Sequence, residues 1–501
     1  MYHLFGTFFV RTSYFPFNSL DEEPFETKIQ NQEVQEAIYI ASPVLYTELQ
    51  KYAAGTITNA EEKQRIESSV YRYISRMASR CTPFGLFAGC SIGEITGDKT
   101  NIVLSNYNRT TRLDMYFLCA LSQELSKLPE IKGKVKYYPN TTLYPMGNKY
   151  RYVEYQYKNS GRIHQISSVE RSVYLDTILK TARKGVKINE LLNYLVENEI
   201  EQEEALAFIG DLIDSQIIVS ELSPSVTGDD YFDQLIHILE DLKINEVLLS
   251  SLKEIQNLLH QLDSDPKDHV ELYQRIIQKI KAIKIPYEEK FLFQVDMTRN
   301  VVEATLGQDI VDELQSTMAF LNKITNTSRN ENLTQFQQAF YNRYEDREVP
   351  LMEALDPETG IGYPVNQGSG NLSPLLENFN IPAGQANQGT GSQSNDFISG
   401  LFKKATEVSN NEIILDDNDV KNFKTNWDDL PPTIQTKFEI LKSVSDTPVI
   451  YLTGFSGSCG ANMFARFAHT DRKNILWLLI GIYMHILLTS HLFMILTLMK
   501  K

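Results

Sequence analysis

The sequence predicts an α+β fold, with mixed sheets, packed helices and a winged-helix-like peptide-recognition insert. Apolar runs typical of strands and segments with helical periodicity are mixed along the chain. Hydrophobic residues make up 42% of the 501 residues and charged residues 22%, so the chain can bury a large core. Three strand patterns and three helical patterns fall together within 142–222, which is typical of a small winged-helix unit.

The composition argues against several classes of protein. A net charge of −16 disfavours a protein that coats nucleic acid, although it leaves room for a local basic site. The four cysteines form no C-x-x-C pair, so spacing gives no metal site, and their sparse use suits a reducing cytoplasm. No P-loop is present, and GFSGSCG does not match the G-x-S-x-G motif of hydrolases.

The first part, 1–141, is expected to begin with strands at 4–10 and 36–40. The apolar spacing within 61–79 predicts a helix, which Pro83 ends. LFAGCSIGEI and NIVL, joined by TGDK, predict a β-hairpin. Asp114 stands in N-cap position before another helical segment.

The second part, 142–222, is expected to be an element that recognises an extended peptide. Its third helical segment is acidic, which disfavours a helix that reads DNA. An exposed sheet edge beside a helix can instead accept a peptide as an added strand. The alternative is an ordinary structural subdomain.

The third part, 223–473, is expected to hold amphipathic helix over 230–283 and a buried strand that ends at Asp296. Two more helices are predicted at 307–322 and 334–346. The stretch 366–396 is rich in Gly, Asn, Gln and Ser, which predicts a long mobile loop. Residues 447–467 predict a strand, a glycine-rich turn and the start of a helix.

A row of arginines is the most unusual feature of the helix at 61–79 and its end. Arg65, Arg72, Arg76 and Arg80 fall within an arc of about 80° at helical spacing. Like charges at this spacing repel by roughly 0.2–0.5 kcal/mol per pair, so an offsetting partner is expected. Arginine suits bidentate contact with phosphate, and Thr82 could add a hydroxyl donor. The alternatives are a solvated cationic face or pairing with nearby glutamates.

Several motifs, taken together, resemble the lantibiotic dehydratase family, N-terminal (glutamylation) part. They are FVRTSYFPF near the start, RMASRCTPFGLFAG, RLDMYF, QVDM, VPLMEALDPETGIGYP and SGSCGANMFARF. They occur in order and cover nearly everything up to residue 473. Their combination is far more specific than any single motif.

The resemblance implies tRNA-dependent glutamyl transfer to Ser or Thr side chains of a ribosomally made precursor peptide. Elimination of the glutamate would then leave a dehydroamino acid. The implied catalytic residues are Arg76, Arg80, Thr82, Asp114, Asp296 and Arg466. Arg65, Arg72, Arg76 and Arg80 would bind tRNA phosphate, and 142–222 would bind the leader peptide. Alanine, Ala465, precedes Arg466 where the family has a G-R-F stretch, and Asp114 could serve only as an N-cap.

The resemblance implies no cofactor beyond glutamyl-tRNA as co-substrate, and it implies a precursor peptide as partner. Further expected partners are a separately encoded elimination component, a cyclase and a second copy in a homodimer. Two alternative functions are a non-catalytic module that binds the precursor peptide and a membrane-tethered scaffold.

The apolar segment 474–501 departs from the family pattern. Residues 1–473 carry all 64 acidic residues, and 474–499 also lack lysine and arginine. A frameshift or premature end is the first interpretation, which would leave the elimination domain absent and glutamyl transfer doubtful. A membrane helix, which would make the protein membrane-associated, and an ordinary buried helix are the alternatives.

Overall fold

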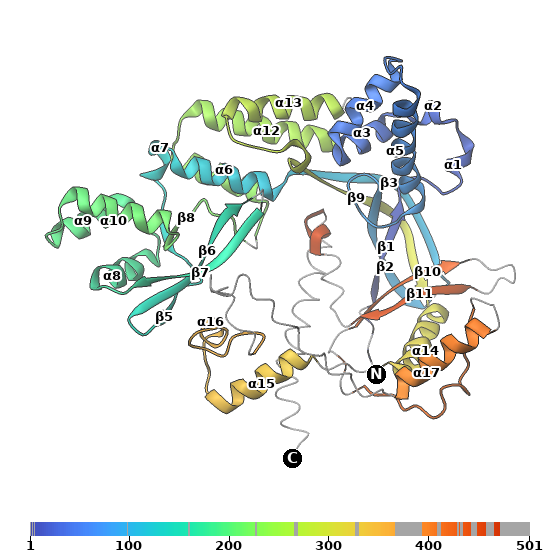
Figure 1. The fold of residues 1–501 in the computed structure, drawn as a ribbon. Helices are drawn as coiled ribbons and strands as arrows, with labels where there is room; N and C mark the ends of the chain where they lie inside the picture. The colour runs from blue at the N-terminus through green and yellow to red at the C-terminus, as the bar shows by residue number, and fades with distance from the viewer. Residues whose placement is uncertain are drawn as a thin grey trace. The chain divides into compact units, whose positions relative to one another are not determined.

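The computed structural model describes most of the chain between residues 2 and 470. The stretches that it does not describe within this range are 3, 5, 98, 159–160, 226–227, 265–268, 326–329, 366–392, 408–411, 428–429, 431–433, 442–447 and 457–464. Helices and several small sheets form two compact units, which confirms the α+β prediction (Figure 1). The first unit is Met1–Arg112 with Phe293–Ser328 and Gln385–Lys501, and the second is Leu113–Leu292 with Arg329–Gly384.

A four-stranded sheet forms the centre of the first unit. Its strands, in spatial order, are β1 (Thr7–Ser13), β2 (Ala88–Gly97), β9 (Phe293–Gly307) and β3 (Asn101–Leu113). β2 pairs with β1 antiparallel and with β9 parallel. The predicted hairpin of β2 with β3 is therefore wrong, because β9 lies between them. A turn signal is local, so it cannot reveal that β9, which begins only at Phe293, is inserted between β2 and β3.

Helices pack beside one end of this sheet. They are α1 (Ser19–Glu22), α2 (Phe25–Lys28), α3 (Gln32–Ala41), α4 (Pro43–Ala53) and α5 (Ala60–Ser79). The strand predicted at 36–40 is wrong, because these residues belong to α3. Asn31 caps that helix, and Val34, Ala37 and Ile38 form its buried stripe at helical spacing. The helix predicted at 61–79 is confirmed as α5.

Most of the remaining elements of the first unit lie beside the other end of the sheet (Figure 1). They are α14 (Gln308–Ile324), α17 (Gln393–Glu407), β10 (Gln435–Leu441) and β11 (Val449–Ser456). The 3-10 helix η2 (Ala465–Thr470) instead contacts β9 and packs Phe467 against Cys90 of β2. An apolar cluster of Leu306, Ile310 and Val311 joins β9 to α14 and to the β10–β11 hairpin. The predicted loop 366–396 lies mostly outside the described residues, and its last four residues begin α17.

The second unit contains the predicted insert. The strands β5 (Tyr144–Met146), β6 (Lys149–Lys158) and β7 (Gly161–Glu170) form an antiparallel sheet, followed by α8 (Val173–Ala182), α9 (Ile188–Glu197) and α10 (Gln202–Asp214). These elements confirm the three strands and three helices predicted within 142–222. A separate pair joins β4 (Tyr137–Pro139) to β8 (Ile218–Ser220). The domain boundaries at 141, 222 and 473 remain predictions.

Helices make up the rest of the second unit. They are α6 (Met115–Lys127), α7 (Pro129–Lys132), α11 (Tyr231–Asp241), α12 (Glu246–Ser264), α13 (His269–Ile283), η1 (Glu289–Phe291), α15 (Glu331–Tyr344) and α16 (Leu351–Ala354). The amphipathic region predicted over 230–283 is three helices, and α12 packs on both α11 and α13. Within the described residues, no helix is both long and apolar enough to cross a bilayer. The apolar segment 474–501 lies outside them.

A buried carboxylate in the DPETG stretch fastens the chain after α16 to the β5–β6 hairpin. Asp356 accepts hydrogen bonds from the Tyr144 hydroxyl at 2.6 Å and from Arg151 Nη1 at 2.8 Å. Its Oδ1 also accepts from the backbone N–H groups of Glu358 and Thr359, both at 2.9 Å. Burial raises the pKa of Asp356, but these hydrogen bonds outweigh it and hold the pKa below its ordinary value. The motif therefore has a structural role in this unit.

Replacing Asp356 with alanine should destabilise the second unit by about 3–5 kcal/mol, because Arg151 would keep a buried charge without its main partner. Urea unfolding monitored by circular dichroism measures this change. Glu358→Ala is the matched control, because the Glu358 side chain is 54% exposed in its pair with Arg151 and such pairs contribute about 1 kcal/mol or less. Equal effects from the two variants would contradict the structural role of Asp356.

Candidate functional site

The helix α5 presents an open row of guanidiniums. The Asn59 side chain caps its N-terminus by accepting from the backbone N–H groups of Glu61 and Glu62. Ile66, Val70 and Met77 turn into the core, which leaves Arg65 and Arg72 exposed on the neighbouring face. Both arginines line a shallow hollow of about 310 Å3, together with Glu61, Gln64, Ser68 and Ser69.

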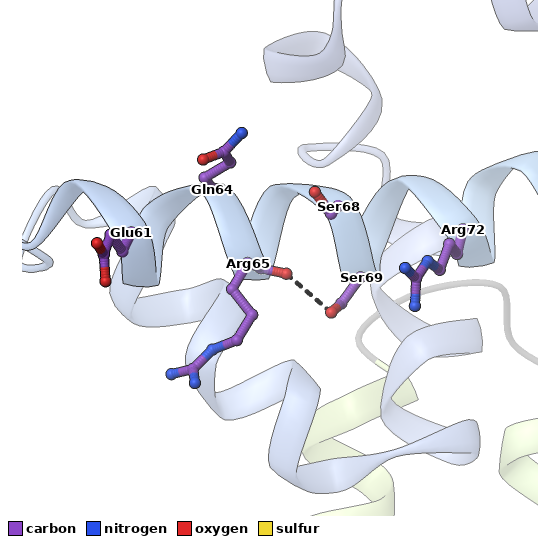
Figure 2. A pocket seen from close by; sticks show the side chains of 6 residues that line it. All are labelled: Glu61, Gln64, Arg65, Ser68, Ser69 and Arg72. Carbon is purple, nitrogen blue, oxygen red and sulfur yellow. Dashed lines mark hydrogen bonds between the residues drawn. The ribbon is translucent and has the colours of Figure 1, made fainter.

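The arrangement of this hollow favours anion binding. Figure 2 shows Arg65, Ser69 and Arg72 on the same side of the helix, with the Ser69 hydroxyl donating to the Arg65 carbonyl at 2.8 Å. Among the described residues, no carboxylate forms an ion pair with Arg65, Arg72, Arg76 or Arg80. The alternative of pairing with nearby glutamates is therefore not supported. Glu67, for example, accepts a hydrogen bond from the Tyr52 hydroxyl at 2.7 Å.

The Thr-Pro-Phe-Gly turn after α5 supports Arg76. The Arg76 guanidinium lies 4.8 Å from the Phe84 ring centre and 5.9 Å from that of Phe87. Gly85 has a φ of +51°, which glycine adopts at little cost, and the Phe87 N–H donates to the Phe84 carbonyl. The aromatic rings therefore hold a half-buried cation in a defined position.

Arg80 does not continue the helical row. It is the C-cap of α5, with φ −118° and ψ 119°, so helical spacing does not set the direction of its side chain. Arg80 and Thr82 are both exposed. The arc predicted for four helical arginines is correct for Arg65, Arg72 and Arg76 but wrong for Arg80.

A second cluster of charges surrounds Asp296, which lies within β9 and not at its end as predicted. Its side chain is 1% exposed. Arg466, from η2, donates to Oδ1 through Nε at 2.9 Å, and its Nη2 lies 2.8 Å from the same oxygen. On the other side, Oδ2 accepts from Gln294 at 3.0 Å and from Arg112 Nη2 at 3.3 Å. The structure therefore brings together two of the predicted catalytic residues, Asp296 and Arg466, and it adds Arg112 and Gln294.

His469 completes this second cluster. Its Nε2 lies 3.5 Å from Asp296 Oδ2. Burial and the positive charge of Arg112 lower the pKa of His469 to about 4, against a smaller opposite effect of Asp296. The imidazole is therefore neutral near pH 7. His469 was not among the residues predicted from the sequence. The signal that could have indicated it is its position three residues after the predicted Arg466.

The low pKa of His469 predicts a pH dependence of stability. In the unfolded chain, histidine has a pKa of about 6.5. In the folded protein, the pKa of His469 is about 4, so its imidazole stays unprotonated until the pH falls to about 4. The unfolded state therefore binds more protons in this window, so the free energy of unfolding should fall as pH drops from about 6.5 to 4. His469→Asn should flatten this slope in urea titrations at several pH values. An unchanged slope would contradict a neutral, buried His469.

Asp114 lies in the second unit, at the start of α6. Its carboxylate accepts a hydrogen bond from the Tyr116 backbone N–H at 2.8 Å, and its own N–H donates to the Leu292 carbonyl. The N-cap interpretation is therefore confirmed. A catalytic role for Asp114 remains a prediction.

The described residues thus present guanidiniums in two places, the open row on α5 and the pair that contacts Asp296. The chain belongs to the lantibiotic dehydratase family, because the family model "Lantibiotic dehydratase, N terminus" matches residues 30–478. This match confirms the resemblance found in the motifs.

Curated relatives include the subtilin biosynthesis protein SpaB of Bacillus subtilis, 25% identical over 343 residues, and the nisin biosynthesis protein NisB of Lactococcus lactis subsp. lactis, 24% identical over 348 residues. These alignments cover 66% and 68% of this chain, but 32% and 34% of the relatives. The chain therefore spans about a third of the length of these relatives.

Solved structures share the fold. The tRNA-dependent lantibiotic dehydratase MibB from Microbispora sp. 107891 superposes with a TM-score of 0.72 at 22% identity, covering 91% of this chain and 44% of that one. The glutamylation domain of TbtB, from thiomuracin biosynthesis, gives a TM-score of 0.55 at 14% identity, covering 89% of this chain and 55% of that one.

Proposed function

We propose that this chain provides the glutamyl-transfer step in the dehydration of Ser and Thr residues of a ribosomally made precursor peptide. Glutamyl-tRNA is the donor. The observation that carries the proposal is the open row of guanidiniums on α5, which have no carboxylate partner among the described residues of an acidic chain. Such a row suits the phosphates at the acceptor end of a tRNA.

The chemistry requires positioning more than strong acids or bases. The Ser or Thr hydroxyl oxygen attacks the glutamyl ester carbonyl and loses its proton, and the ribose oxygen of the tRNA leaves with a proton. The product is a glutamyl ester of the peptide, whose carboxylate is a far better leaving group than hydroxide. Arg76, Arg80 and Thr82 would hold the acceptor end, while Arg466 and Asp296 would stabilise and orient the reacting groups.

An exposed sheet edge in the second unit supports this assignment. In the described sheet, β7 is the last strand of the order β5-β6-β7, so one of its edges is available to an added strand. Ile163 and Ile166 on β7 are 51% and 41% exposed. The acidic residues Glu203, Glu204 and Asp211 of α10 are also exposed, which favours a basic or neutral peptide over nucleic acid.

The proposal is tested by incubating the full chain with glutamyl-tRNA and candidate precursor peptides. A mass increase of one glutamyl group per modified side chain is the expected result, and Arg76→Gln should abolish it. Peptide binding that persists without any glutamyl transfer, in wild type as in the variant, would identify a non-catalytic peptide-binding module instead. Fluorescence anisotropy with labelled leader peptide measures that binding separately.

A further inference from the structure

The cluster around Asp296 carries more positive charge than its carboxylate can neutralise. Arg112 and Arg466 both contact Asp296. Arg11 lies opposite Cys90 in the β1–β2 pairing, and the charges of Arg11, Asp296 and Arg466 all act on the pKa of the Cys90 thiol, which burial raises to about 12. Among the described residues, Asp296 is the carboxylate that pairs with Arg112 and Arg466. Such an excess favours a bound anion.

Arg112 has unused hydrogen-bonding capacity in this cluster. Within the described residues it makes one hydrogen bond, from Nη2 to Asp296 at a long 3.3 Å. Its side chain is 28% exposed, and its buried Nε has no hydrogen-bond partner. A guanidinium offers five N–H donors in a planar fork that fits a carboxylate bidentately. By contrast, Arg466 uses two of its nitrogens on a single oxygen of Asp296.

The identity of this anion follows by elimination, and the assignment rests on the proposed function. The guanidiniums of α5 serve the tRNA phosphates, and the ester carbonyl is the reacting group. The γ-carboxylate of the glutamyl side chain remains, and it is the group that distinguishes glutamate from glutamine. We propose that Arg112 binds this γ-carboxylate and is a specificity-determining residue. A neutral glutaminyl side chain would leave the guanidinium without a charged partner, which is how a polar site rejects an isostere.

The test is isothermal titration with two phosphate-free probes, 3′-amino-3′-deoxyadenosine acylated with glutamate or with glutamine. Wild-type protein should prefer the glutamyl probe. Arg112→Gln should lower the affinity for the glutamyl probe by about 10- to 100-fold, which is the effect of losing one charge-assisted pair. It should change the affinity for the glutaminyl probe by less than about 3-fold. Arg112→Lys should restore part of the preference. Arg275→Gln, on the exposed face of α13 in the other unit, is the matched control and should change neither value.

The outcomes separate the two proposals. If Arg112→Gln lowers the affinity for both probes equally, with unchanged urea unfolding, Arg112 contacts the adenosine or backbone part that the probes share. This outcome would overturn the role of Arg112 in specificity but not the proposed function. Wild-type protein that binds neither probe would overturn the proposed function, and the role of Arg112 with it. Loss of the glutamyl preference, with partial rescue by lysine, supports the role of Arg112.

Discussion

Replacing Asp296 with asparagine should destabilise the first unit by about 1.5–3 kcal/mol and abolish glutamyl transfer. The physical reason is that the Asp296 carboxylate is 1% exposed and contacts two guanidiniums. Its neutral substitute would remove the buried charge that both guanidiniums share, although Arg112 and Arg466 themselves stay 28% and 44% exposed to water. Urea unfolding reports the free energy of unfolding, and the mass assay with glutamyl-tRNA reports transfer.

The matched control for this variant is Asp312→Asn on α14, in the same unit. Asp312 is exposed and accepts one hydrogen bond from Gln308, so its replacement should change stability by less than about 0.5 kcal/mol. An Asp296→Asn protein as stable as this control would contradict the burial and pairing of Asp296. Retained transfer would contradict its place in the reaction.

Replacing Arg72 and Arg76 together with glutamine should lower affinity for the acceptor end of tRNA and weaken its dependence on salt. Each phosphate contact contributes about 0.7 to the slope of log affinity against log salt for a single strand. Loss of two contacts should therefore reduce that slope by about 1.4 and transfer by at least about 100-fold. Filter binding of a glutamyl minihelix at several salt concentrations measures the slope.

Lys63→Gln is the control for general charge, because Lys63 lies on the same helix but faces the Tyr52 ring at 5.4 Å. It removes a positive charge from α5 outside the arginine row. An unchanged slope in the double variant, or an equal change in Lys63→Gln, would show that α5 does not bind the acceptor end.

Local patterns predicted the fold where local physics decides it. The 3.6-residue period of Ile66, Val70 and Met77, followed by Pro83, was sufficient for α5. The same reasoning failed at 36–40, where a short apolar run suits a strand or a buried helix equally well. It also failed for β2 and β3, because pairing with β9 depends on contacts across about 200 residues.

The candidate site was predictable only in part for the same reason. The arginine row lies on one helix, so its spacing could be read directly, apart from Arg80 after the helix end. In the cluster around Asp296, Arg112 lies 184 positions before Asp296 in the sequence, and Arg466 lies 170 positions after it. Periodicity does not report such separations, and the family motifs indicated Asp296 and Arg466 but not the roles of Arg112, Gln294 or His469.

Photo-crosslinking tests the central claim most directly. A glutamyl-tRNA minihelix carrying 4-thiouridine near its 3′ end is irradiated with the full chain, and the attached peptide is identified by mass spectrometry. If the acceptor end binds along the arginine row of α5, the crosslinked peptide should lie within 61–84, and unlabelled tRNA should reduce the crosslinking. Attachment confined to the second unit, with 61–84 unlabelled, would contradict it.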